Sequence, residues 1–230
     1  MMATPTSLED IVSQLDDQRL YDLAELEAAG LSKMAVSRLT EKGRLTSPVR
    51  GVYIRPDFEP HILDDHLLVV KRAPNVIFNL YTAARIHDIT QVEPNDLWIG
   101  LRPSEKNPPK MGDTFHLELQ TLRWARPVDV EVGIETIFIR GVELKLTNPE
   151  RTVVDMWRYS RHNPSMKSQH QRITDEHAMQ CLGAYLEANS GKTSGLGSMA
   201  MKLNLSPAAT ENFISFVQTY SSGLAFHRVF

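Results

Sequence analysis

A short stretch with both ends marked, GLSKMAVSRLTEKGRLTSPVRGVYIR at residues 30–55, constrains the fold of this chain more than any other. Ser32 is a favourable N-cap, because its hydroxyl can accept an amide hydrogen bond that the first turn of a helix leaves open. Gly43 can take the left-handed conformation that ends a helix. The stretch therefore predicts a helix over residues 33–42.

This helix has one apolar and one polar face. At about 100° per residue, Val36, Leu39 and Thr40 share a face with Ala35 beside them, and we expect that face to be buried. The opposite face offers hydrogen-bonding groups and positive charge, which suits a helix that reads the major groove of DNA. Its side chains are Met34, Ser37, Arg38 and Glu41, flanked by Lys33 and Lys42.

A second helix is expected just before it, over residues 21–29, with Leu23, Leu26 and Ala29 facing inward. A short turn at Gly30 then joins the two helices, which is the helix-turn-helix arrangement.

The residues after the second helix predict a hairpin. Residues 44–45 and 51–54 have the composition of short strands, and the turn between them contains residues 47–50. A hairpin in this place is a wing, so the whole stretch predicts a winged helix-turn-helix.

Charge is concentrated on the same module. Residues 30–57 hold six Lys or Arg against two acids, whereas residues 1–29 hold one Arg against seven acids. A chain of net charge −3 with such a local basic patch is typical of a protein that binds the phosphate backbone of DNA.

Eight side chains are the predicted DNA contacts. The four expected to face base edges, with Arg38 the best candidate for a bidentate contact to guanine, are Lys33, Met34, Ser37 and Arg38. The four expected to hold phosphates or to reach the flanking minor groove are Ser32, Lys42, Arg44 and Arg50.

Three segments together resemble one protein family. They are similar to segments of the AbiEi-type antitoxins of type IV toxin–antitoxin and phage abortive-infection systems. The first segment is GLSKMAVSRLTEKGRL followed by RGVYIRPD, the second is YTAARIHDI and the third is LTNPERTVVDMWRY. The resemblance covers about residues 18–161. It implies a repressor that binds an inverted repeat in its own promoter, and a second domain that neutralises a nucleotidyltransferase-like toxin, without a stable complex being required. The chain after residue 161 has no matched motif.

Length and composition indicate a globular protein of two modest domains. The 230 residues are 42% hydrophobic and 23% charged, and no apolar run approaches the ~20 residues that span a bilayer. The acidic N-terminus is unlike a secretory signal, so we expect a cytoplasmic protein. The single cysteine, Cys181, excludes an internal disulfide and a cysteine-based zinc site.

We expect an α+β fold in three parts: a winged helix-turn-helix domain at residues 1–58, a mixed α+β domain at 59–161 and a helical extension at 162–230. In the first part, Ser7 is expected to cap a helix that runs to about Gln18. The inward side chains of this helix are predicted to be Leu8, Ile11, Val12 and Leu15.

The second part alternates helices with short strands. Helices are predicted at residues 62–71 and 80–88, and strands at 76–78, 97–101, 115–122, 128–132 and 136–146, the last folded into a hairpin at Gly141. Residues 102–112 are expected to form an exposed loop. Asn148 and Pro149 should begin a helix on whose surface Arg151 and Asp155 can pair.

The third part is predicted to be helical at residues 175–188 and 207–220, with a Gly/Ser-rich break at 190–198. A polar segment at residues 161–170 is expected to separate it from the second part.

Two other functions remain open. Asp129, followed on a neighbouring strand by Glu143 and Lys145, has the layout by which a nuclease holds Mg²⁺ and activates water, although alternating inner and outer residues of a strand explain the same pattern. A plain regulator, whose second domain senses a ligand or a protein, is the other alternative. We otherwise expect no enzymatic activity.

We expect no cofactor or metal. Ser190 to Ser194 echoes a phosphate-binding loop but lacks the first glycine and the preceding strand. His61 and Asp65 lack a third ligand. His87 is expected to be a hydrogen-bonded structural histidine.

Overall fold

The computed structural model describes residues 7–93, 96–105, 107–124, 126–161 and 172–227. The chain divides into two compact units, one formed by residues 1–76, 109–117 and 137–144, the other by residues 77–108, 118–136 and 145–230. The predicted polar segment at residues 161–170 lies almost entirely outside the described residues.

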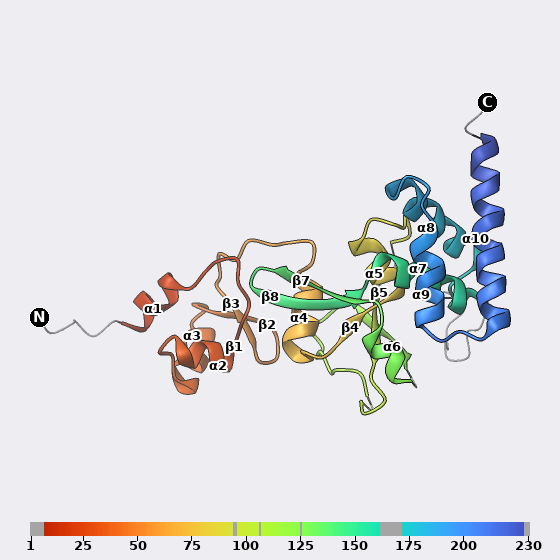
Figure 1. The fold of residues 1–230 in the computed structure, drawn as a ribbon. Helices are drawn as coiled ribbons and strands as arrows, with labels where there is room; N and C mark the ends of the chain where they lie inside the picture. The colour runs from red at the N-terminus through yellow and green to blue at the C-terminus, as the bar shows by residue number, and fades with distance from the viewer. Residues whose placement is uncertain (1–6, 94–95, 106, 125, 162–171, 228–230) are drawn as a thin grey trace, which may run out of the picture. The chain divides into compact units, whose positions relative to one another are not determined.

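The first unit combines short helices with a small antiparallel sheet (Figure 1). Its elements in chain order are α1 (Leu8–Gln14), β1 (Tyr21–Asp22), α2 (Leu23–Ala28), α3 (Lys33–Glu41), β2 (Thr46–Val49), β3 (Val52–Ile54) and α4 (Asp64–Arg72). The strand order is β1-β3-β2, so that β3 is central. Tyr21 of β1 lies opposite Tyr53 of β3, and Val49 of β2 lies opposite Val52.

One apolar cluster holds α1, α2 and α3 together. Its buried members are Val12, Leu15, Tyr21, Leu26, Leu31, Val36, Leu39 and Leu45. The predicted N-cap of α1 is confirmed, since Ser7 and Asp10 form a reciprocal capping box. The helix is shorter than predicted, however, because it ends at Gln14, and Leu8 is exposed on its first turn.

The prediction for the inner face of α2 is correct for Leu26 but wrong for Ala29. Leu26 is fully buried, whereas Ala29 is the exposed C-cap residue. The first strand of the predicted hairpin is also displaced along the chain. It occupies Thr46–Val49, because residues 43–45 are used to close α3.

A five-stranded mixed sheet, in the order β6-β5-β4-β8-β7, is the framework on which the second unit is built. The strands are β4 (Ile77–Phe78), β5 (Asp96–Leu101), β6 (Glu118–Arg123), β7 (Ile134–Ile139) and β8 (Val142–Thr147). The β4 strand runs antiparallel to β5 and parallel to β8, and β5 runs parallel to β6. The tip of the β7–β8 hairpin, residues 137–144, is grouped with the first unit.

Helices cover this sheet and extend beyond it. They are α5 (Leu80–Ile86), α6 (Pro127–Glu131), α7 (Pro149–Arg161), α8 (Asp175–Ala188), α9 (Ser194–Lys202) and α10 (Pro207–His227). In Figure 1, α8, α9 and α10 lie around α7. The helices after residue 161 therefore share one core with α7, through buried side chains such as Trp157, Cys181 and Phe213.

Two predictions of secondary structure in the second unit are wrong. Residues 128–132 were expected to form a strand, but α6 occupies them, because Pro127 starts a helical turn and Arg126 bonds to Asp129 three residues on. The Gly/Ser-rich break at 190–198 is shorter than expected. It ends at Ser194, where α9 begins with buried residues at helical spacing.

Candidate nucleic-acid interface

The α3 helix is fixed at both ends by hydrogen bonds that its sequence predicts. The Oγ of Ser32 accepts a hydrogen bond from the backbone N–H of Ala35 at 3.3 Å. At the other end Gly43 has φ 67° and donates to the carbonyl of Thr40, and the next amide donates to the carbonyl of Leu39. These two bonds form a Schellman motif, which satisfies carbonyls that a helix end leaves open.

The inner face of α3 is buried as predicted. Ala35, Val36 and Leu39 belong to the core of the first unit. Thr40 is half-buried, and its hydroxyl donates to the carbonyl of Val36 at 2.9 Å. Burial of this face fixes the rotation of the helix about its axis, so the opposite residues must face solvent.

The outer face of α3 is exposed as predicted. Met34 is 65% exposed, and Lys33, Ser37, Arg38 and Glu41 are exposed with it. The hydroxyl of Ser37 donates to the carboxylate of Glu41 at 3.2 Å. This face therefore presents a long apolar side chain, a hydroxyl, a carboxylate and two cations.

Four cations of this region have no acidic partner within the described part of the chain. Lys33 and Arg38 lie on α3, Lys42 is its C-cap, and Arg50 lies in the tight turn between β2 and β3. All four are exposed. Their charge is thus available to an external anion, and phosphate groups of nucleic acid are anions of this kind.

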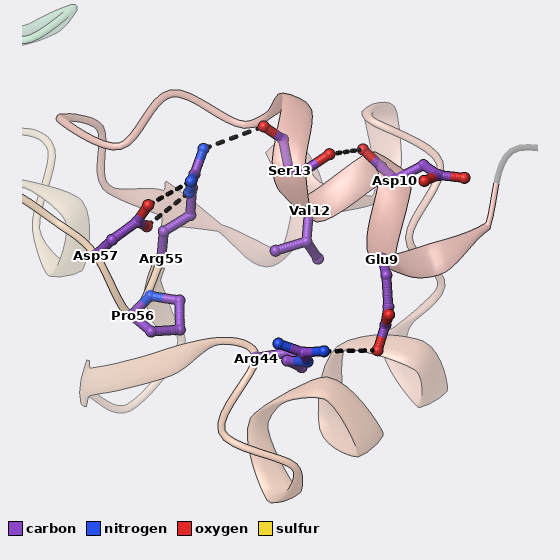
Figure 2. Close-up of a pocket in the computed structure, with 8 residues that line it drawn as sticks. All are labelled: Glu9, Asp10, Val12, Ser13, Arg44, Arg55, Pro56 and Asp57. Atoms are coloured by element: carbon purple, nitrogen blue, oxygen red, sulfur yellow. Dashed lines mark hydrogen bonds and ion pairs between the residues drawn. The ribbon is translucent and has the colours of Figure 1, made fainter.

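The other two cations of residues 30–57 are already paired (Figure 2). Arg55 binds both carboxylate oxygens of Asp57, at 2.8 and 2.5 Å, and donates to the carbonyls of Ser13 and Leu15. This arginine fastens the end of α1 to the segment that follows β3. Sequence reasoning missed this role, because the partners at Ser13 and Leu15 lie some forty residues away.

Arg44 is paired in a different way. Its Nη2 lies 3.2 Å from Oε1 of Glu9 in α1, and the side chains of both residues are more than half exposed. A cavity of about 470 Å³ lies between these residues and the Arg55–Asp57 pair, lined also by Asp10, Val12, Ser13 and Pro56 (Figure 2). Arg44, which was predicted to contact a phosphate, is therefore already paired with an acidic side chain.

The second unit, in contrast, contains an arginine that is buried and paired with a carboxylate. Arg151 of α7 is fully buried, and its Nε donates to Asp155 at 2.6 Å. Its other donors reach the carbonyls of Val132 and Asp129, and its guanidinium lies over the ring of Trp124. The predicted pairing of Arg151 with Asp155 is confirmed, but its predicted place on the helix surface is wrong, because the pair is in the core.

Asp129 extends this buried cluster. It accepts hydrogen bonds from Arg126 at 3.0 and 2.7 Å and from Arg158 at 3.3 Å. Burial alone would raise the pKa of Asp129, but the hydrogen bonds from Arg126 and the charges of Arg158, Arg126 and Arg151 outweigh it and hold the pKa below the ordinary aspartate value. Asp129 is thus a structural anion.

The residues of the nuclease hypothesis do not have the arrangement that it required. Asp129 was expected on a strand but lies in α6 with its carboxylate bound by arginines, whereas Glu143 and Lys145 lie on β8. Within the residues that the structure describes, no group of three or more His, Cys, Asp or Glu side chains could hold a metal ion.

Other residues that resembled chemical sites have structural environments. His87 bonds to the carbonyl of Thr147 at 2.7 Å, as predicted for a structural histidine. Cys181 is buried, and burial raises the pKa of its thiol to about 12, which favours the protonated form at neutral pH. The ring of His61 accepts a hydrogen bond from the amide of Leu63, just before α4. Residues 190–194 follow α8, without a preceding strand.

Comparison with known proteins gives a fold likeness. The chain is similar in structure to the RV2827C protein from Mycobacterium tuberculosis, with a TM-score of 0.53 and 16% sequence identity, over 92% of this chain and 75% of that chain. At this identity the likeness concerns the fold alone. No protein-family model and no curated protein sequence matches the chain. No helix among the described residues is long and apolar enough to cross a membrane.

Proposed function

We propose that the chain is a sequence-specific repressor that binds double-stranded DNA through a winged helix-turn-helix. In this proposal α2 and α3 are the helix-turn-helix, the β2–β3 hairpin is the wing, and the outer face of α3 enters the major groove. The observation that carries the proposal is the helix α3, whose inner face is buried. Its outer face, its C-cap and the adjoining turn present four exposed cations that have no acidic partner among the described residues.

The proposed base contacts are the side chains that the inner face forces outward. Arg38 can donate two parallel hydrogen bonds to a guanine, and Lys33 and Ser37 lie on the same face. Met34 offers an apolar surface that fits a thymine methyl group. Glu41 holds the hydroxyl of Ser37 and can equally accept a hydrogen bond from a cytosine amino group.

The proposed phosphate contacts surround these residues. Lys42 and Arg50 extend from the end of α3 and from the hairpin turn. Ser32 uses its oxygen to cap α3, and its hydroxyl hydrogen remains available to a phosphate. Arg44 must leave Glu9 to make its contact. Such contacts fix the position on DNA and make binding depend steeply on salt.

The binding mode on DNA is proposed to be that of a homodimer on an inverted repeat, as in the AbiEi-type antitoxins that the sequence resembles. The proposal extends to their second activity, neutralisation of a nucleotidyltransferase-like toxin by residues 59–161. The antitoxin role is supported by sequence resemblance: the segments that form α5, with its flanks, and α7 resemble the second domain of AbiEi-type antitoxins. These helices pack together around the Thr147–Thr152 hydrogen bond and the His87 contact. Such a protein would act in the cytoplasm, without a cofactor and without catalysis.

A footprint of the purified protein on the DNA upstream of its own gene tests the proposal. We expect protection of an inverted repeat that weakens steeply as salt rises, with the DNA left uncut whether or not Mg²⁺ is present. Protection without cleavage supports the repressor, while cleavage would favour a nuclease. No protection at any salt concentration would contradict DNA binding.

The antitoxin role needs a separate test. Co-expression with the product of the neighbouring gene should restore growth if that product is the toxin. The Arg38→Ala variant, expressed from an unrelated promoter, should still restore growth, because neutralisation is assigned to the second domain. If the wild-type protein restores no growth, the alternative of a plain regulator with a sensing second domain is favoured.

A further inference from the structure

The ion pair between Arg44 and Glu9 joins a proposed phosphate contact to the acidic N-terminal helix. We infer that Glu9 sets the affinity of this surface for DNA, by competing with a phosphate group for the guanidinium of Arg44. This inference rests on the proposed DNA-binding function. Glu9 is on this view an internal substitute for phosphate, held in place by α1.

Only one of the two paired arginines near the cavity can exchange its partner. Arg55 makes four hydrogen bonds, two to Asp57 and two to backbone carbonyls, and its side chain is only 20% exposed. The side chain of Arg44 makes one hydrogen bond within the described part of the chain, to Glu9, and it is 58% exposed. Arg44 can therefore leave its carboxylate without disturbing the backbone, and Arg55 cannot.

The position of α1 does not depend on the Arg44–Glu9 pair. Val12 and Leu15 anchor the helix in the core of the first unit, and Arg55 binds the carbonyls at its C-terminal end. The cavity of about 470 Å³ shows that the first turn, with Glu9, does not pack closely on Arg44 and the segment after β3 (Figure 2). Loss of the pair therefore leaves the fold intact.

The competition is graded and does not block binding. Exposed ion pairs of this kind are weak, so releasing Arg44 should raise the affinity for DNA by about two- to fivefold. The gain should be independent of sequence, because Arg44 is assigned to a phosphate and not to a base.

The test compares Glu9→Gln with Glu27→Gln in the full chain. Glu27 is an exposed acid of α2 without an ion-pair partner in the described part of the chain, so both variants remove one negative charge from the same unit. The probe is a fluorescein-labelled random-sequence duplex, titrated by anisotropy at low and at physiological salt. Both substitutions are repeated in an Arg44→Ala background, and the unfolding midpoint is measured for each protein.

We expect Glu9→Gln to bind the duplex about two- to fivefold more tightly than Glu27→Gln, and we expect this difference to vanish in the Arg44→Ala background. Equal binding by the two variants would overturn the inference, as would a Glu9→Gln gain that persists without Arg44. If the wild-type protein fails to bind any duplex, the proposed function itself fails, which is a distinct result.

Discussion

On α3 and the hairpin that follows it, Lys33, Arg38, Lys42 and Arg50 extend into solvent, whereas Arg151 of α7 is fully buried and bonded to Asp155. Both regions are rich in cations, yet only the first offers charge to a partner. In the second, Arg151 is bonded to Asp155 and to two backbone carbonyls, and Arg158 is paired with Asp129. A count of cations along a sequence therefore says little about binding until burial and pairing are known.

The same contrast between exposed and buried side chains distinguishes two sequence motifs of this chain. The stretch at residues 30–55, for which we propose a helix-turn-helix and wing, exposes the polar residues of α3 on which that proposal rests. In contrast, Arg151 and Asp155 of the Asn-Pro-x-Arg-Thr-x-x-Asp segment are buried together, and Asn148 of that segment accepts the amide of Arg151 at 2.9 Å. A motif of the second kind preserves a fold and does not by itself mark a site of chemistry.

The largest effect that we expect follows Arg151→Ala. Asp155 is fully buried and would lose its closest partner, which costs about 3 to 5 kcal/mol of unfolding free energy. Urea denaturation measures this loss. Arg161→Ala on the same helix is the control. Arg161 is exposed, its ion pair with Asp175 is long at 3.8 Å, and its guanidinium lies over the ring of Trp157, so its loss should change stability by less than about 1 kcal/mol. Similar small losses in both variants would remove the contrast between buried and exposed cations.

Asp129→Asn should have a smaller effect that depends on pH. The pKa of Asp129 is held below its ordinary value, so the carboxylate stabilises the fold at any pH above the unfolded-state pKa of about 4, and this stabilisation disappears as the pH falls through the folded-state pKa. At neutral pH we expect a loss of about 2 kcal/mol, because hydrogen bonds to a charged group are replaced. Unfolding free energies of both proteins should converge in acid, and a constant difference down to low pH would contradict this role.

Arg38→Ala should leave stability unchanged within about 0.5 kcal/mol but weaken binding to the operator by about 1 to 3 kcal/mol. The reason is that Arg38 has no partner in the described part of the chain and is assigned to a base. Competition between operator and random duplex measures the loss of preference. An equal loss on the two duplexes would make Arg38 a phosphate contact.

Lys42→Ala should have the smallest effect. We expect it to weaken binding to all sequences alike and to lower the slope of the logarithm of the binding constant against the logarithm of salt by about one. Titrations at several salt concentrations give the slope. An unchanged slope would show that Lys42 does not contact a phosphate.

The local features of the fold were predictable because they depend on neighbours in sequence. Ser7, Ser32 and Asn148 cap helices where their side chains can reach the open amides, and Gly43 ends α3. The exposed face of α3 follows from its buried face by helical geometry. These features include most of the candidate DNA contacts.

The features that the sequence did not reveal depend on distant contacts. The alternation of Val128, Asp129 and Val130 matches a strand. The helix α6 forms there instead, supported by the local Arg126–Asp129 pair and by a distant bond from Arg151 to the carbonyl of Asp129. The burial of Arg151 and Asp155 requires the packing of α8 and α9 on α7, which no local pattern predicts.

Two further features, α9 and the Glu9–Arg44 pair, were not predicted for other reasons. A signal for α9 was present, since Leu196, Met199, Ala200 and Leu203 have helical spacing, but the surrounding Gly and Ser residues obscured it. The link of Glu9 to Arg44 spans 35 residues and has no local signature.

The most direct measurement is the binding of a labelled duplex to two charge-matched variants at physiological salt. In one variant Lys33, Arg38, Lys42 and Arg50 are replaced by Ala. In the other the replaced residues are four exposed cations outside α3 and the hairpin, namely Lys110, Arg172, Lys192 and Lys202. We predict that the first variant loses binding and that the second keeps nearly all of it, because long-range charge is screened at this salt concentration. Equal loss in the two variants would contradict the assignment of the DNA-binding surface to α3 and the hairpin.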